Sequence, residues 1–146
     1  MRVLVLNGPN LGRLGSREPE VYGTQDLAAI EHHLTAQAPN GVEIDLRQTD
    51  DEAELIGWLH EAADSGDPVI LNPAAFTHYS YALRDAVALV TRAGGTVVEV
   101  HLSNPSAREE FRHTSVISGV ATGVVAGFGA DSYLVALDAI ARRARG

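Results

Sequence analysis

The sequence contains no lysine, because all 11 of its basic residues are arginine. An enzyme that forms an imine with its substrate, or that holds pyridoxal phosphate as an imine, needs a lysine amine. A Walker-type phosphate loop needs a lysine as well. The missing residue therefore excludes both classes of protein.

Cysteine is absent too, which excludes a thiol nucleophile, a disulfide and a thiolate zinc site. The N-terminal apolar run, Val3 to Leu6, is far too short for a signal peptide or a membrane span. We therefore expect a cytoplasmic protein. With 19 acidic residues against 11 basic ones, the net charge of −8 argues against general binding to nucleic acids or anionic membranes.

The length of 146 residues suits one domain over residues 1–146, with a core of its own. Short apolar segments alternate with segments of helical periodicity. The predicted strands are residues 2–7, 42–47, 69–71, 96–100 and 120–126. The predicted helices run from a cap at Thr24 or Asp26 to about Ala38, from Asp50 or Asp51 to before Gly66, from Ser80 to Ala93, and from Asp131 or Ser132 to Arg143.

This alternation predicts an α/β fold with one five-stranded parallel sheet and helices on both faces. The predicted strands are interpreted as apolar throughout, as burial on both faces requires. In such a doubly wound sheet, ligands bind at the carboxyl ends of the strands. Polar residues gather there: Asn10 follows the first strand, Asn72 and His78 the third, and His101 and Ser103 the fourth. We expect them to form one site.

Glu99 and His101 are two residues apart on a predicted strand, so their side chains point to the same side. A carboxylate beside an imidazole selects one tautomer and makes the histidine a plausible general acid. A purely structural pair fits the spacing equally well. His78 suits either a ligand contact or a hydrogen bond within its own loop.

Residues 12–23 have no periodicity and are rich in glycine and charge, which fits a lid over an active site. Tyr22 near Arg17 suggests a phenol whose pKa lies below its usual value. The tyrosinate can then act as a base. The alternative is a solvated loop with a packed tyrosine. The glycines do not match the dinucleotide-binding fingerprint.

Several other polar residues allow a simple surface interpretation. Asp85 lies off the inner face of its helix, beside Arg84. Arg108 and Arg112, four residues apart, suit either a clamp for an anionic substrate or pairing with neighbouring glutamates. Four histidines are expected on the surface, and no spacing of ligands predicts a metal site. These histidines are His32, His33, His60 and His113.

Long stretches of the chain resemble type II 3-dehydroquinate dehydratases, in order and at the expected spacing. The matching stretches are residues 7–15 (Asn-Gly-Pro-Asn-Leu-Gly-Arg-Leu-Gly), 17–19, 22–23, 71–73, 77–78, 82–86, 99–104 and 108–112. The resemblance implies a flavodoxin-like fold and the reversible dehydration of 3-dehydroquinate to 3-dehydroshikimate, an anti elimination through an enolate. It also implies no cofactor, no metal, and a homo-oligomer, typically a dodecamer built from trimers.

The resemblance further implies the catalytic roles. Tyr22 takes the proton alpha to the ketone, and Arg17 lowers its pKa and closes with the lid. Asn10 positions a water that stabilises the enolate. His101, oriented by Glu99, protonates the departing hydroxyl.

The substrate-binding roles follow in the same way. Asn72, His78 and Arg112 bind ring hydroxyls. Ser103 and the backbone N–H of Leu102 hold the carboxylate. Asp85 is contributed by a neighbouring subunit of the trimer and supports the lid.

The chain departs from the family at three positions: Tyr79 replaces a usual threonine, Thr114 a common histidine and Gly119 a common proline. None of these removes a catalytic group, although Tyr79 lies beside His78. Other functional classes share the predicted architecture. A phospho-accepting receiver domain needs an acidic cluster after the first strand and a lysine after the fifth, and a flavodoxin-like electron carrier needs a hydroxyl-rich phosphate loop. A member of the same family without catalytic activity is a further alternative.

Overall fold

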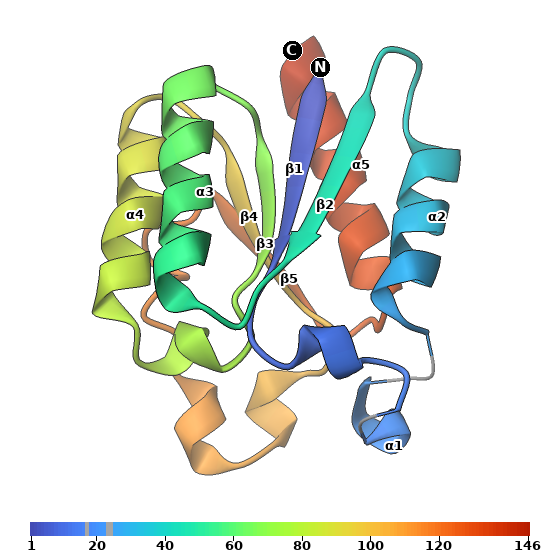
Figure 1. Cartoon of the computed structure of the whole chain (residues 1–146), viewed down its shortest axis with the longest axis vertical. Coiled ribbons are helices and arrows are strands. Elements are labelled where there is room, and N and C mark those ends of the chain that lie inside the picture. Colours follow the sequence, from blue (N-terminus) through green and yellow to red (C-terminus); the bar gives the residue numbers. More distant parts are fainter. Residues whose placement is uncertain (17, 23–24) are drawn as a thin grey trace.

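A computed structural model describes residues 1–16, 18–22 and 25–146, with the side chains of Pro19 and Tyr22 outside that description. Its sheet contains five parallel strands in the order β2-β1-β3-β4-β5 (Figure 1). The strands are β1 (Arg2–Asn7), β2 (Glu43–Gln48), β3 (Val69–Asn72), β4 (Val97–His101) and β5 (Gly123–Ala126). This is the flavodoxin-like order, so the predicted fold class is confirmed.

Helices cover both faces of the sheet, as predicted. The helices are α1 (Pro19–Tyr22), α2 (Leu27–Gln37), α3 (Glu52–Ser65), α4 (Tyr81–Arg92) and α5 (Asp131–Arg145). In Figure 1, α3 and α4 lie on one side and α2 and α5 on the other. Each pair encloses its own apolar core against the sheet. None of the helices in the described part of the chain is long and apolar enough to cross a membrane.

Most predicted boundaries hold because the capping residues act as expected. The side chains of Asp26, Asp51 and Ser80 each accept a backbone N–H in the first turn of α2, α3 and α4. The last strand is shorter than predicted, because residues 120–122 form a turn and β5 begins only at Gly123. An apolar run by itself does not distinguish a strand from a packed turn.

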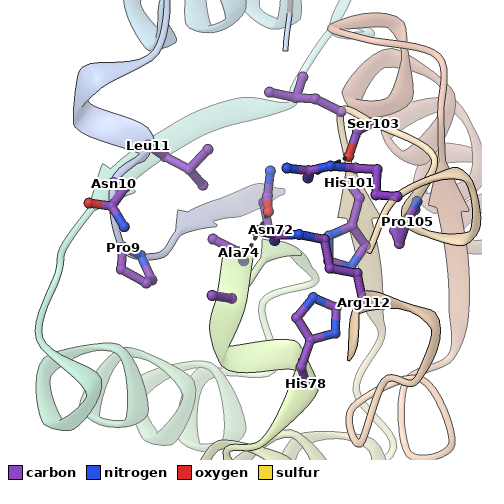
Figure 2. A pocket seen from close by; sticks show the side chains of 13 residues that line it. Pro9, Asn10, Leu11, Asn72, Ala74, His78, His101, Ser103, Pro105 and Arg112 are labelled. Carbon is purple, nitrogen blue, oxygen red and sulfur yellow. Dashed lines mark hydrogen bonds between the residues drawn. The ribbon is translucent and has the colours of Figure 1, made fainter. Parts of the chain in front are cut away.

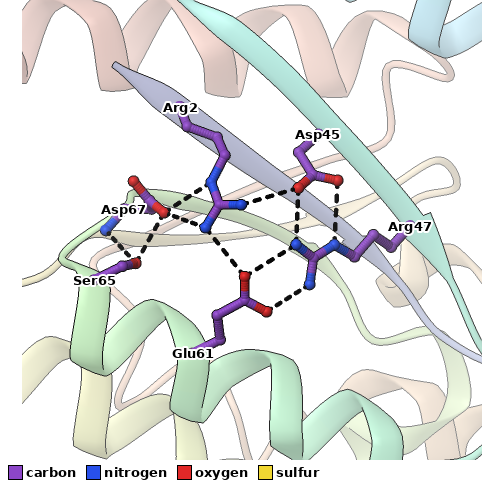
Figure 3. A network of polar contacts seen from close by, with 6 residues as sticks. All are labelled: Arg2, Asp45, Arg47, Glu61, Ser65 and Asp67. Carbon is purple, nitrogen blue, oxygen red and sulfur yellow. Dashed lines mark hydrogen bonds and ion pairs between the residues drawn. The ribbon is translucent and has the colours of Figure 1, made fainter.

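The expectation of uniformly apolar strands is wrong for β2, which lies at the edge of the sheet. Ile44 and Leu46 pack on the core beneath α2, whereas Asp45 and Arg47 point to the opposite face. That face carries an ion-pair network in which Arg2 and Arg47 alternate with carboxylates (Figure 3). An edge strand needs apolar residues on only its covered face.

Glu61 of α3 links the two arginines of this network, at 2.7 Å from Arg47 Nη1 and 3.1 Å from Arg2 Nη2. The hydrogen bond from Arg47 holds the pKa of Glu61 at about 2, below its ordinary 4.5. Above pH 4.5 Glu61 is ionised in both the folded and the unfolded chain, and its ion pairs stabilise the folded state fully. This stabilisation is lost as the pH falls from 4.5 through 2, where Glu61 becomes protonated in the folded state too.

Glu61→Gln is therefore expected to lower the free energy of unfolding at pH 7 by about 1 kcal/mol, a figure reduced for the partial exposure of Glu61. The difference from the wild type should vanish toward pH 2. Urea unfolding between pH 2 and 8 measures both. Glu31→Gln, on the exposed face of α2, is the matched control and should change little. A pH-independent difference would contradict the ion-pair explanation.

Gly8 brings the ends of β1 and β3 close together. Its N–H donates to the Asn72 carbonyl at 2.8 Å. A Cβ at this position would lie 2.7 Å from the Pro73 carbonyl oxygen, closer than atoms of a side chain can approach. Only glycine lets the loop after β1 lie against the loop after β3, and these two loops form one side of the site described next.

Candidate active site

One pocket opens at the carboxyl ends of β1, β3 and β4, where the fold predicts a ligand site (Figure 2). Seven of the residues predicted from the sequence line it: Asn10, Asn72, His78, His101, Leu102, Ser103 and Arg112. In Figure 2, Asn10 lies on one side, and His78, His101 and Arg112 lie on the other. Side chains from segments far apart in the sequence thus converge on one cavity.

Asn10 reaches the pocket through an unusual backbone conformation. Its φ of 70° is left-handed, a region that asparagine tolerates better than most residues. The Asn10 N–H donates to Asp50 Oδ1 at 2.9 Å, and Gln48 Nε2 donates to the same oxygen and to the Gly8 carbonyl. The last residue of β2 and the segment after it therefore hold the loop that carries Asn10.

Asn72 lies at the end of β3, beside Asn7 at the end of β1. Its Oδ1 accepts the Ala74 N–H at 3.1 Å, and its Nδ2 donates to the Tyr133 hydroxyl at 2.9 Å. Only 3 % of Asn72 is exposed, so the amide is held rather than solvated. It is one of the polar groups that the pocket presents to a ligand.

Glu99 and His101 form the expected pair on β4. His101 Nε2 lies 2.5 Å from Glu99 Oε2, and Glu99 is completely buried. Three hydroxyls also donate to the carboxylate: Thr77 at 2.5 Å, Ser118 at 2.6 Å and Ser115 at 3.2 Å. Every polar atom of this buried group is paired, as a buried charge requires.

The surroundings of Glu99 keep it ionised. Burial acts to raise its pKa, but the hydrogen bond and charge of His101, together with the Ser118 and Thr77 hydroxyls, lower the pKa below its usual value. The anion fixes the imidazole through Nε2. Nδ1 is then the ring nitrogen left for a bound molecule, since a carboxylate on one nitrogen determines the role of the other.

Cationic groups form another part of the wall. Arg108 and Arg112 both line the pocket, with 16 % of each side chain exposed. Arg108 donates to Ser103 Oγ at 3.2 Å, and Arg112 Nε lies 3.2 Å from Glu109. The predicted pairing with a glutamate is therefore confirmed, and because both arginines also line the pocket, the clamp for an anionic substrate stays a prediction. Such a wall suits a small anion.

His78 completes this side of the pocket. Its Nδ1 is 2.9 Å from the Thr114 carbonyl, and its ring meets the edge of Phe111. The loop contact and the pocket position coexist, so the two interpretations of His78 do not exclude each other. The four histidines expected on the surface are all exposed.

Glu99 is buried behind His101 and does not line the pocket, and three further predicted site residues are not placed there. Asp85 lies on α4 with 77 % of its side chain exposed and contacts Arg84. Tyr22 ends α1, and its side chain is outside the described structure. Arg17 also lies outside the described residues. Glu20 and Val21 of α1 line a second hollow, which shares Leu102, Ser103 and Arg108 with the first.

Sequence patterns missed the residues that support the site from behind. Thr77, Ser115 and Ser118 surround Glu99, and Asn7 and Tyr133 lie behind Asn72. No local spacing identifies them, because each approaches from a different segment. Within the described ranges, no group of three or more His, Asp or Glu side chains is arranged to hold a metal ion.

Comparison with known proteins gives consistent matches. Residues 1–141 match the model of the family "Dehydroquinase class II". The 3-dehydroquinate dehydratase of Salinispora tropica is 60% identical over 146 residues, covering 99% of this chain and 100% of that protein. The 3-dehydroquinate dehydratase of Kineococcus radiotolerans is 58% identical over 147 residues, covering 100% and 99%.

Solved structures agree with these sequence matches. The crystal structure of the type II dehydroquinase from Propionibacterium acnes superimposes with a TM-score of 0.91 at 46% identity, covering 97% of this chain and 96% of that one. The type II dehydroquinase from Butyrivibrio crossotus gives a TM-score of 0.85 at 39% identity, covering 94% and 95%.

Proposed function

The chain belongs to the class II dehydroquinase family, and we infer that it removes water from 3-dehydroquinate to give 3-dehydroshikimate by anti elimination through an enolate. The observation that carries the mechanism is the buried Glu99–His101 pair facing a pocket lined by amides and arginines. Elimination of water needs a base, a stabiliser of the enolate, an acid for the leaving hydroxyl and a binding site for the carboxylate. Family membership leaves no support for the receiver-domain or electron-carrier alternatives.

His101 is proposed as the general acid. Glu99 fixes Nε2, so Nδ1 is the atom from which a proton passes to the departing hydroxyl. The carboxylate also stabilises the protonated imidazole until the proton is transferred. As the hydroxyl leaves with this proton, the C–O electron pair departs with water, and the enolate electrons form the new carbon–carbon double bond.

The substrate carboxylate is proposed to bind at the end of β4. The backbone N–H of Leu102 and the Ser103 hydroxyl receive it, and both residues line the pocket. Asn72, His78 and Arg112, which also line the pocket, bind ring hydroxyls. Binding at several points around the ring holds the reacting carbons in one orientation, which lowers the barrier by proximity.

Tyr22 is proposed as the base that takes the proton alpha to the ketone. Arg17 lowers its pKa, and residues 12–23 act as a lid. Support comes from the neighbouring residues Glu20 and Val21, which line a hollow continuous with Ser103. Asn10 is proposed to hold a water that stabilises the enolate oxygen, from the side of the pocket next to the lid.

The proposal includes a homo-oligomer, a dodecamer built from trimers, in which Asp85 supports the lid of a neighbouring subunit. On α4, Tyr81 and Leu89 are 71% and 52% exposed, one helical turn to either side of the 77% exposed Asp85 side chain. Two large apolar residues flanking a carboxylate suit a protein–protein contact. The reaction is proposed to occur in the cytoplasm.

The direct test mixes the protein with 3-dehydroquinate and follows the ultraviolet absorbance of the conjugated enone. We expect absorbance to rise without added metal or cofactor, and no rise from correctly assembled protein would refute the activity. Borohydride added during turnover should trap no adduct, because the chain has no lysine to form an imine. A stable reduced adduct would contradict the enolate route.

Mixing two inactive variants tests the role of Asp85. Asp85→Ala and Tyr22→Phe should each lose most turnover. When equal amounts are dissociated and reassembled together, about one quarter of wild-type activity should return, since hybrid sites combine an intact Tyr22 with an intact Asp85. No recovery, or fully active isolated monomers, would show that Asp85 does not reach a neighbouring site.

A further inference from the structure

A buried chain of polar side chains runs beneath the pocket, from Asn7 through Tyr133 to Asn72. Asn7 and Tyr133 are completely buried, and they come from β1 and α5. The Tyr133 hydroxyl donates to Asn7 Oδ1 at 2.6 Å, and Asn72 Nδ2 donates to the hydroxyl at 2.9 Å. The functions proposed above make no use of Asn7 or Tyr133.

Backbone groups at both ends determine the direction of this chain. Asn7 Nδ2 donates to the Val5 and Arg47 carbonyls, at 3.3 and 3.0 Å. A carbonyl only accepts, so the Asn7 amide cannot be turned around, and its Oδ1 must face Tyr133. The hydroxyl has one proton, which it gives to that oxygen, and it is then an acceptor for its other neighbour.

Asn72 is constrained in the same way from both sides. The hydroxyl accepts, so Asn72 must present Nδ2 to it, and the Ala74 N–H donates, so Asn72 must present Oδ1 there. If the Asn72 amide were flipped, its Nδ2 would face the Ala74 N–H, and two donors would meet. Its Oδ1 would face the Tyr133 hydroxyl, whose only proton is already donated to Asn7. One N–H and one lone pair of the Asn72 amide are left for the pocket that it lines.

We propose that Tyr133 is a positioning residue that fixes the orientation of the Asn72 amide, so that Asn72 donates to one substrate hydroxyl and accepts from another in a set arrangement. The proposal rests on the function proposed above, in which Asn72 binds a ring hydroxyl. Burial raises the pKa of the Tyr133 phenol, so it stays protonated and keeps donating to Asn7. Phenylalanine would preserve the ring and its packing but leave Asn7 Oδ1 and one N–H of Asn72 without the hydroxyl that they contact.

Tyr133→Phe is the test. We expect KM for 3-dehydroquinate to rise about tenfold, from the loss of a buried, oriented hydrogen-bonding group, while kcat changes less. In an Asn72→Ala background, the same substitution should produce no further rise in KM, because the amide on which Tyr133 acts is gone. An unchanged KM, or the full rise in both backgrounds, would overturn the proposal.

Ile140→Val is the matched control for stability. It removes a methyl group from the buried face of the same helix and does not touch the polar chain. It should lower Tm without changing KM. If Tyr133→Phe does not fold, Asn7→Ala provides the second variant, because it frees the Tyr133 hydroxyl to turn its proton toward Asn72. It should also raise KM, and no rise would count against the proposal.

An NMR measurement separates this inference from the proposed activity. The Asn72 side-chain proton that donates to Tyr133 should exchange slowly with water in the wild type and rapidly in Tyr133→Phe. An inactive wild-type protein would refute the activity while leaving this exchange result valid. Equal exchange rates in both proteins would refute the orienting role whether or not the enzyme is active.

Discussion

Replacing His101 by asparagine is expected to lower kcat by about 10²- to 10⁴-fold, the range that general acid catalysis supplies. Asparagine carries an N–H that can still serve Glu99, but it has no group that releases a proton near neutral pH. The leaving hydroxyl would then depart as hydroxide. Because Glu99 keeps its Thr77, Ser115 and Ser118 donors, the variant should fold.

The enone absorbance assay measures this loss, and circular dichroism with thermal melting checks the fold. His60→Asn is the matched control, because His60 is exposed on α3 and does not line the pocket. It should retain wild-type kinetics. A His101→Asn enzyme within a few-fold of the wild-type kcat would show that another group protonates the leaving hydroxyl.

Tyr22→Phe is expected to reduce turnover by a similar factor, about 10²- to 10⁴-fold. Phenylalanine keeps the ring but cannot accept the proton alpha to the ketone. Substrate binding should change little, since the carboxylate and hydroxyl contacts are assigned to the end of β3 and to the segments that follow β3 and β4. The variant should therefore lose kcat while its affinity for substrate is retained.

Two measurements separate this outcome from misfolding. Calorimetric titration with 3-dehydroquinate should give near-wild-type affinity, and turnover should be slow. Exchange of the substrate's alpha proton with deuterated water, a step before water is lost, should disappear together with turnover. Continued exchange in Tyr22→Phe would mean that a different base removes the proton.

The two variants act at opposite ends of the elimination, and their comparison is informative. His101→Asn retains the base, so alpha-proton exchange should continue when dehydration is slow. Tyr22→Phe should abolish both processes. This difference follows from the proposed assignment of Tyr22 as the base and His101 as the acid. If exchange were lost in His101→Asn and kept in Tyr22→Phe, His101 would be the base and Tyr22 the acid.

Sequence patterns determined the architecture because they reflect local physics. Alternating apolar runs and capped helices predicted the parallel sheet, and Asp26, Asp51 and Ser80 cap their helices as expected. Polar residues after strands predicted the pocket, because the carboxyl ends of parallel strands meet at one edge. The spacing of Glu99 and His101 likewise predicted their pairing. The motif resemblance added the reaction and the role of each residue.

Tertiary structure alone decided how these groups are held. The Ser115 and Ser118 hydroxyls reach Glu99 across 16 and 19 residues of chain, and Tyr133 reaches Asn7 across 126. No periodicity encodes such contacts, since they depend on how separate elements pack. The polar face of β2 is similar, because its place at the sheet edge leaves Asp45 and Arg47 partly exposed to solvent. The absence of lysine excluded imine chemistry from the sequence alone, whereas the ionised, enclosed Glu99 behind His101 became visible only in the fold.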